Sequence, residues 1–231
     1  MKITSNQTVH QLTFLPLFFP FNCYFVDEED GLTLIDTGMS FSSKSILQTA
    51  SNLGKPIQRI ILTHAHEDHV GGLDQLKQAL PNVPVYISQR DAQLLAGDKS
   101  LIAGEPNVPI RGSVPSKIQT KPDVLLSDGD RIGSLLALSA PGHTPGSMVF
   151  LDTRNRILIA GDALQTRGGV AISGQLNIWF PFPAWATWHK SSAVDSAKKI
   201  LELNPSLLAV GHGQMVINPV DVIRKAIKRS E

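Results

Sequence analysis

Short apolar runs that end in turn residues alternate with amphipathic stretches along most of this chain, and this alternation constrains its fold most strongly. Residues 31–35 lead into Asp36-Thr37-Gly38, and residues 59–62 lead into Thr63, as strands that end in loops do. Similar strand-like runs cover residues 83–87, 131–139, 147–151, 156–160 and 207–210. Apolar side chains recur at helical spacing in residues 42–53, 73–80, 191–203 and 219–229. Strands interleaved with helices predict a layered α/β fold in which helices cover the faces of sheets.

Composition narrows the classes of protein that this chain can represent. Its 231 residues are 42% hydrophobic and 18% charged, which is typical of an ordered chain with a substantial core. No low-complexity linker or clear boundary interrupts it, so we expect a single domain over residues 1–231. The formal charge of +1 gives no net field that would attract a nucleic acid. We therefore expect no nucleic-acid partner.

The cysteine content and the apolar N-terminal region bear on the compartment. Cys23 is the only cysteine, so no intrachain disulfide can form, and we expect a cytoplasmic protein in which this thiol is a small buried apolar group. The apolar residues 12–26 are interrupted by Pro16 and Pro20. This stretch is typical of two short strands joined by a proline turn, and not of a signal peptide or a membrane span. Residues 97–122, which are rich in proline, predict a long connection.

Histidines and aspartates follow several of the predicted strands. Five of the seven histidines, with Asp162, have this placement: His64, His66, His69, His143 and His212. Side chains at one end of neighbouring strands converge in space, so we expect these loops to form one pocket. Imidazole and carboxylate ligands together suit zinc, iron or manganese, and the cluster holds enough ligands for two ions. His64 and His66 stand two residues apart and can flank one metal, while the adjacent Asp68 and His69 point differently and suit a second.

These residues resemble the signature of the metallo-β-lactamase superfamily of metallohydrolases. The resemblance rests on His64-x-His66-x-Asp68-His69 with Gly71-Gly72, on the later His143, Asp162 and His212, and on the upstream Leu34-Ile-Asp36-Thr-Gly38. It extends from about residue 22 to residue 215. It implies a four-layer αβ/βα sandwich with the metals at one edge of the sheets.

The resemblance also implies a role for each residue. His64, His66 and His143 would hold one metal ion, Asp68, His69 and His212 would hold the second, and Asp162 would bridge both. Asp36 would orient the site without binding metal, which meets the general need to fix the direction and tautomer of metal ligands. Asp68 could additionally accept a proton from the attacking water.

Two divalent ions, with zinc favoured and iron or manganese as alternatives, make water available as a nucleophile near neutral pH. We therefore expect hydrolysis of an ester, lactone, thioester or related bond of a small molecule. True β-lactamases of this fold usually have Cys or Ser where Asp162 stands, which argues against antibiotic hydrolysis. An iron-dependent oxygenase resembling the persulfide dioxygenases is the alternative from another class. A metal-binding protein without catalysis is the third.

The three tryptophans, Trp179, Trp185 and Trp188, lie in one aromatic segment between Asp162 and the helical stretch 191–203. They could form an apolar wall beside the metals. Equally, they could anchor the start of the helix to the core or contact a partner subunit. The sequence leaves open whether the chain forms a homo-oligomer.

Overall fold

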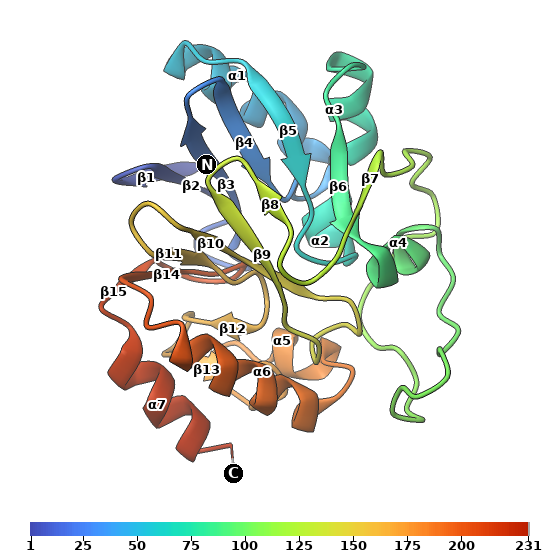
Figure 1. Cartoon of the computed structure of the whole chain (residues 1–231), viewed down its shortest axis with the longest axis vertical. Coiled ribbons are helices and arrows are strands. Elements are labelled where there is room, and N and C mark those ends of the chain that lie inside the picture. The colour runs from blue at the N-terminus through green and yellow to red at the C-terminus, as the bar shows by residue number, and fades with distance from the viewer. Residues whose placement is uncertain (231) are drawn as a thin grey trace. The chain divides into compact units, whose positions relative to one another are not determined.

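The computed structural model describes residues 1–230, which divide into two compact units with a sheet and helices each (Figure 1). Unit 1 comprises Met1–Gly97 and Ser113–Leu126. Unit 2 comprises Asp98–Gly112 and the chain from Ser127 onward. None of the helices within residues 1–230 has the length and apolar composition that a bilayer span requires. The prediction of a single domain over residues 1–231 stays a prediction.

Unit 1 contains a mixed sheet in which the strands follow one another in chain order. Its strands are β1 (Lys2–Asn6), β2 (Val9–Phe14), β3 (Phe21–Glu28), β4 (Gly31–Ile35), β5 (Ile57–Ile61), β6 (Val85–Ser88) and β7 (Val124–Leu126). Neighbours from β1 to β4 pair antiparallel, and those from β4 to β7 pair parallel. Because Ile35 pairs with Ile61 in the parallel β4–β5 ladder, Asp36 and His64 leave the sheet at the same edge.

The helices of unit 1 lie in the connections between its parallel strands. They are the 3₁₀ turn η1 (Ser40–Ser42), α1 (Ser43–Leu53), α2 (Glu67–Val70), α3 (Leu73–Ala79) and α4 (Gln89–Leu95). α1 buries Ile46 and Ala50, and α3 buries Leu73 and Leu76. The expected helices at 42–53 and 73–80 are therefore confirmed, although the last apolar residue of the first stretch, Leu53, is 37% exposed. The short helices α2 and α4 carry too few apolar residues for their periodicity to reveal them.

Unit 2 contains a second mixed sheet and a small hairpin. In spatial order, the main sheet comprises β15 (Val216–Ile217), β14 (Leu207–Ala209), β11 (Ile157–Ile159), β10 (Met148–Asp152), β9 (Leu135–Ser139) and β8 (Arg131–Ile132). The hairpin pairs β12 (Leu164–Gln165) with β13 (Ala171–Ile172). The helices are α5 (Phe182–Ala186), α6 (Lys190–Glu202) and α7 (Val220–Lys228), and α6 and α7 lie side by side (Figure 1). An apolar core joins sheet residues such as Leu158 and Leu208 to Ala197 of α6 and Ile223 of α7.

The strand directions of unit 2 bring three predicted ligands to one edge of its sheet. β11 and β14 are parallel, so Asp162 and His212, which follow them, leave at the same edge. β10 runs antiparallel to both β9 and β11, so the connection from β9 to β10, which contains His143, lies at that edge too. In each unit, an aspartate follows one strand and a histidine follows the next parallel strand of the same sheet, with helical residues between them.

Most of the predicted strands are present, with one clear difference. The two strands expected around Pro16 and Pro20 are β2 and β3, and residues 97–122, all described, contain no helix or strand. The predicted single strand at residues 131–139 is wrong, because the chain reverses within it to form the β8–β9 hairpin, in which Ile132 pairs with Leu135. Gly133 has a φ of 57°, in the left-handed region that favours glycine, and this permits the two-residue turn.

Gly142 is constrained by close contact with α6. Its φ is 142°, and a Cβ added there would lie 2.4 Å from the backbone N and Cα of Ala193. We expect Gly142→Ala to lower the free energy of unfolding by about 3 kcal/mol, because it combines overpacking with backbone strain. Gly129→Ala is the matched control in unit 2, since its φ is 91° but nothing lies within 4 Å. Its expected loss is about 1–2 kcal/mol from strain alone. Equal losses in urea unfolding would contradict the packing argument.

Candidate metal centre

The unit 1 ligand cluster, defined as His64, His66, Asp68 and His69, lies immediately after β5. His66 has extended backbone angles and precedes α2, whose first turn carries Asp68 and His69. Ligand atoms of His64 lie within 4.8 Å of ligand atoms of both His66 and His69. Asp68 Oδ2 lies 3.9 Å from His69 Nε2. The structure therefore brings together all four residues that the sequence predicts for this loop.

Asp36 orients this cluster through hydrogen bonds on both of its oxygens. Its Oδ1 accepts the backbone N–H of Thr63 at 2.8 Å, and its Oδ2 accepts the Thr63 hydroxyl at 2.8 Å. Oδ2 also lies 2.7 Å from Nδ1 of His69. The carboxylate can only accept, so His69 carries its proton on Nδ1 and presents Nε2 as a ligand atom. This is the contact pattern that an orienting carboxylate requires.

Thr63 extends the same ordering to His64. Its hydroxyl lies 3.0 Å from His64 Nδ1, and its single proton is already donated to Asp36. The oxygen of Thr63 must therefore accept a proton from Nδ1 of His64. Both imidazoles are consequently held in the tautomer whose Nε2 bears a lone pair. This is the state in which a neutral histidine binds a metal.

Asp91 supports the backbone between two of the ligands, and sequence reasoning missed it. Its buried Oδ2 accepts the backbone N–H of Ala65, which separates His64 from His66, at 2.9 Å. The backbone N–H of Asp91 is in turn capped by the Ser88 hydroxyl at the start of α4. The spacing Ser88-x-x-Asp91 is a helix-capping signature. It could have located the start of α4, but not the contact with Ala65.

The unit 2 ligand cluster, defined as His143, Asp162 and His212, gathers around one carboxylate oxygen. Asp162 Oδ2 lies 3.3 Å from Nε2 of His143 and 3.1 Å from Nε2 of His212. All three side chains are buried. Residues from three separate loops therefore place two imidazole nitrogens and one carboxylate oxygen together, as the sequence predicts.

Ser173 orients His143 in the way that Asp36 orients His69, and the sequence gives no signal for it. Its hydroxyl donates to the backbone oxygen of Asp162 at 2.5 Å and lies 3.0 Å from Nδ1 of His143. Since its proton is used on Asp162, Ser173 accepts the proton of Nδ1. Nε2 of His143 then bears a lone pair that faces an oxygen of Asp162. Two such atoms repel each other unless a proton or a metal ion lies between them, so this donor set is able to bind a metal ion.

Ser173→Ala removes the nearer of the two hydroxyl acceptors on His143 Nδ1, which lies 3.0 Å from Ser173 and 3.4 Å from Thr187. We expect zinc affinity, measured by competition with a chromophoric chelator, to fall about 10- to 100-fold, the usual effect of losing a partner of a metal ligand. Ser196→Ala is the matched control because Ser196 is also buried in unit 2 and donates to a backbone carbonyl, that of Pro141. Its zinc affinity should match that of the wild type. Equal affinities for all three proteins would show that Ser173 does not orient His143.

Cys23 is buried in β3. Burial raises the pKa of its thiol well above the ordinary value, and the negative charges of Asp36 and Asp68 raise it further. The thiol therefore stays protonated at neutral pH and cannot supply a thiolate ligand. This agrees with the expectation that Cys23 is a small buried apolar group.

The three tryptophans of the predicted apolar wall have different environments. Trp188 is 6% exposed, and its indole N–H donates to the backbone oxygen of Val108 at 3.0 Å. Trp179 and Trp185 are 78% and 62% exposed. Trp188 is thus built into unit 2, whereas the other two can meet a ligand or partner. The wall itself stays a prediction.

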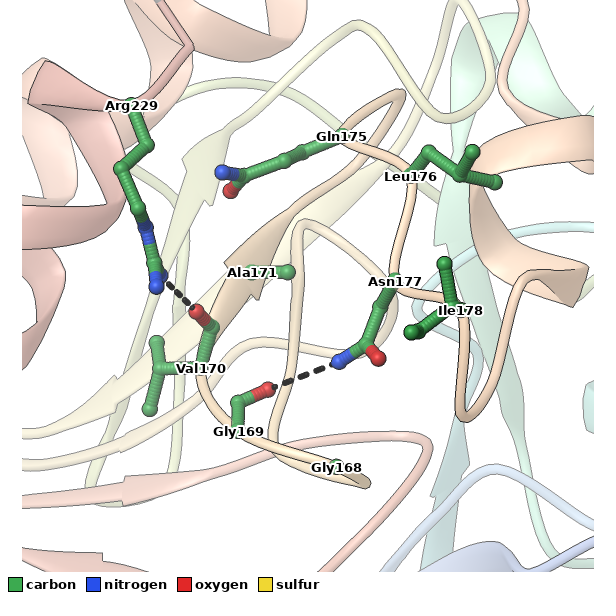
Figure 2. A pocket seen from close by; sticks show the side chains of 9 residues that line it. All are labelled: Gly168, Gly169, Val170, Ala171, Gln175, Leu176, Asn177, Ile178 and Arg229. Carbon is green, nitrogen blue, oxygen red and sulfur yellow. Dashed lines mark hydrogen bonds between the residues drawn. The ribbon is translucent and has the colours of Figure 1, made fainter.

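Unit 2 also contains a cavity of about 280 Å³ (Figure 2). Its lining comprises Gly168, Gly169, Val170, Ala171, Gln175, Leu176, Asn177, Ile178 and Arg229. Figure 2 shows Asn177 donating to the oxygen of Gly169, and Arg229 donating to that of Val170. Arg167, which precedes the lining residue Gly168, donates its backbone N–H to the backbone oxygen of His212. None of the lining residues is a predicted metal ligand.

Comparison with known proteins identifies the family. The model of the metallo-beta-lactamase superfamily matches residues 18–212, which include every predicted ligand. The chain belongs to the metallo-β-lactamase superfamily. The resemblance stated from the sequence is therefore confirmed, and so is the α/β metallo-β-lactamase fold class.

Relatives of this superfamily member include proteins named as metallohydrolases. The uncharacterized protein YobT of Bacillus subtilis is 56% identical over 231 residues, covering 100% of this chain and 99% of its own. The probable metallo-hydrolase YflN of the same organism is 30% identical, and the match covers 83% of this chain and 80% of YflN. The hydroxyacylglutathione hydrolase GloC of Haemophilus influenzae is 29% identical, and the match covers 84% of this chain and 86% of GloC. Membership of a superfamily of metallohydrolases supports the expectation that this protein is an enzyme.

Solved structures agree with this assignment. TTHA1623, crystallised in a di-iron-bound form, is 28% identical with a TM-score of 0.66, covering 91% of this chain and 96% of its own. The DIM-1 metallo-beta-lactamase matches with a TM-score of 0.74, and the match covers 99% of this chain and 96% of the DIM-1 chain. The sequence identity is only 15%. At that identity the likeness shows the fold alone.

Proposed function

We propose that this protein is a hydrolase that uses two divalent metal ions to cleave an ester, lactone, thioester or related bond of a small molecule. The observation that carries the proposal is the tautomer control of His64, His69 and His143. In each, a hydrogen bond on Nδ1 leaves Nε2 as the ligand atom. Histidines with a purely structural role do not need this shared orientation beside carboxylates.

The ligand assignment follows the superfamily resemblance. One ion would be held by His64, His66 and His143, the other by Asp68, His69 and His212, and Asp162 would contact both. Bound ions of this kind lower the pKa of water to about 7 and polarise the bond under attack. Zinc is favoured by the imidazole-rich ligand set, and the di-iron form of TTHA1623 supports iron as the alternative.

Asp68 is the carboxylate that we assign as proton acceptor. Its side chain is 16% exposed, whereas those of Asp36 and Asp162 are 3% and 4% exposed. Water and substrate therefore reach Asp68 more readily than the other two. Asp36 is already the acceptor of three hydrogen bonds, so we assign it the role of holding the ligands in place.

The type of bond is supported by a relative. GloC of Haemophilus influenzae is named for the hydrolysis of hydroxyacylglutathione. Among the bonds that metal-assisted hydrolysis can cleave, this favours an acyl compound. We accordingly place esters, lactones and thioesters ahead of phosphodiesters.

Chelation followed by metal readdition tests the proposed function. Purified protein would be treated with dipicolinate, dialysed, and supplied with zinc, iron(II) or manganese before assay on nitrophenyl esters, lactones, thioesters and phosphodiesters. Hydrolysis of an acyl compound should disappear on chelation and return with metal. Hydrolysis that survives chelation would contradict the proposal. Sulfite formation from glutathione persulfide by the iron-loaded protein, without hydrolysis, would instead favour the oxygenase, and metal binding without either activity would favour the non-catalytic protein.

A further inference from the structure

Aromatic rings form a continuous series from the candidate ligand His212 to the surface of unit 2. The centroid of the Phe180 ring lies 5.2 Å from that of His212. The ring centroids of Phe180 and Phe182 are 5.2 Å apart, and the two rings pack edge to face. The ring centroids of Phe182 and Trp185 are 5.8 Å apart, also with edge-to-face packing. These separations fall within the range in which aromatic rings are in contact. The series therefore connects an imidazole of the metal centre with solvent.

Exposure rises along this series. His212 and Phe180 are each 2% exposed, Phe182 is 45% exposed and Trp185 is 62% exposed. Burial of such large apolar surfaces is favourable, and contiguous exposed apolar surface marks sites where another molecule binds. The outer half of the series is thus available to an apolar ligand.

The two outer rings, those of Phe182 and Trp185, lie on one short helix. Phe182 and Trp185 are three residues apart on α5, so they lie on the same face of this helix. The backbone oxygen of Phe180 accepts the side-chain amide of Gln165 at 3.1 Å, and Gln165 stands three residues after Asp162. The aromatic series is therefore tied to the loop that carries a metal ligand. A prearranged surface of this kind costs little ordering when a ligand binds.

We propose that Phe182 and Trp185 bind the apolar acyl chain of the substrate, with Phe180 supporting them from below. This inference rests on the proposed function and narrows its substrate class to esters, lactones or thioesters whose acyl group is a hydrocarbon chain of medium length. The continuity of the rings with His212 favours a substrate over a partner subunit. A subunit contact would explain the exposure of Trp185, but not the unbroken path to a metal ligand.

Kinetics on a homologous ester series provide the first test. The zinc-loaded wild type, Phe182→Ala and Trp185→Ala would be assayed on nitrophenyl esters from acetate to decanoate. For the wild type we expect kcat/KM to rise about twofold per added methylene, roughly half the effect of complete burial. The rise should be largely lost in both variants and retained in Trp185→Phe. Phe18→Ala is the control because Phe18 is an 85% exposed phenylalanine of unit 1.

Calorimetric binding of decanamide and acetamide separates this inference from the proposed function. We expect decanamide to bind the zinc-loaded protein at least about fivefold more weakly in Phe182→Ala and Trp185→Ala than in the wild type. If this is seen without ester hydrolysis, the acyl site stands and the proposed function fails. Metal-dependent hydrolysis with no dependence on chain length would overturn the acyl site alone. Variants that lose only self-association, measured by light scattering, would assign the rings to a subunit interface and also overturn it.

Discussion

Replacing Asp162 with asparagine is expected to lower ester hydrolysis by the metal-loaded protein about a thousandfold and to remove at least one tightly bound ion. The amide is neutral and cannot offer negative charge to two cations, while His143 and His212 both lie against the oxygen that changes. Loss of a metal that stabilises charge in the transition state costs several kcal/mol, and each 1.36 kcal/mol is a factor of ten in rate. Elemental analysis and steady-state kinetics on the same preparation would measure both effects.

Asp152→Asn provides the control for Asp162. Asp152 is also a buried aspartate of unit 2, and both of its oxygens bind Arg154. Breaking this ion pair should lower the free energy of unfolding while leaving the metal content and kcat unchanged. If Asp162→Asn kept its metal and its activity, Asp162 could not be a bridging ligand.

Asp36→Asn is expected to weaken zinc binding about 10- to 100-fold without removing any proposed ligand. Asp36 accepts hydrogen bonds from the backbone and hydroxyl of Thr63 and from His69. An amide offers one oxygen instead of two, so at least one donor loses its acceptor and the tautomer of His69 is no longer fixed. Competition with a chromophoric chelator would measure the affinity of the variant for zinc.

Asp74→Asn is the control for Asp36, although Asp74 is only partly buried. Asp74 also belongs to unit 1 and accepts hydrogen bonds from both the backbone N–H and the hydroxyl of one threonine, Thr120. It anchors the connection after residue 112 and is not a predicted ligand. We expect Asp74→Asn to retain the zinc affinity of the wild type. Equal weakening by Asp36→Asn and Asp74→Asn would mean that the effect reflects general loosening of unit 1.

The sequence was sufficient to predict that the ligands follow the ends of strands, because apolar runs and the turn residues after them mark those ends. Asp36 and Asp162 follow apolar runs, and each is followed by a helix, a second apolar run and a histidine. Parallel pairing of β4 with β5, and of β11 with β14, then places the members of each pair at one edge. Histidine and aspartate are metal-binding residue types, so the sequence alone indicates the chemistry of the site. What had to be inferred was that these residues lie close together in the fold.

The supporting contacts could not be predicted, because they join residues that are distant in the sequence and chemically ordinary. Ser173 is 30 residues from His143, and Asp91 is 26 residues from Ala65. In the sequence, a serine or an aspartate at these positions is typical of a solvent-exposed polar residue, whereas in the fold both are buried. The same holds for Trp188, whose burial distinguishes it from Trp179 although the two share one aromatic segment.

The central claim is that seven side chains hold two divalent ions, and X-ray anomalous scattering from crystals of the metal-loaded protein tests it most directly. At the absorption edge of the added metal, we expect two peaks per chain, bound by the residues of the unit 1 and unit 2 ligand clusters and sharing Asp162. A chain with no ion, or with ions bound only by other side chains, would contradict the account.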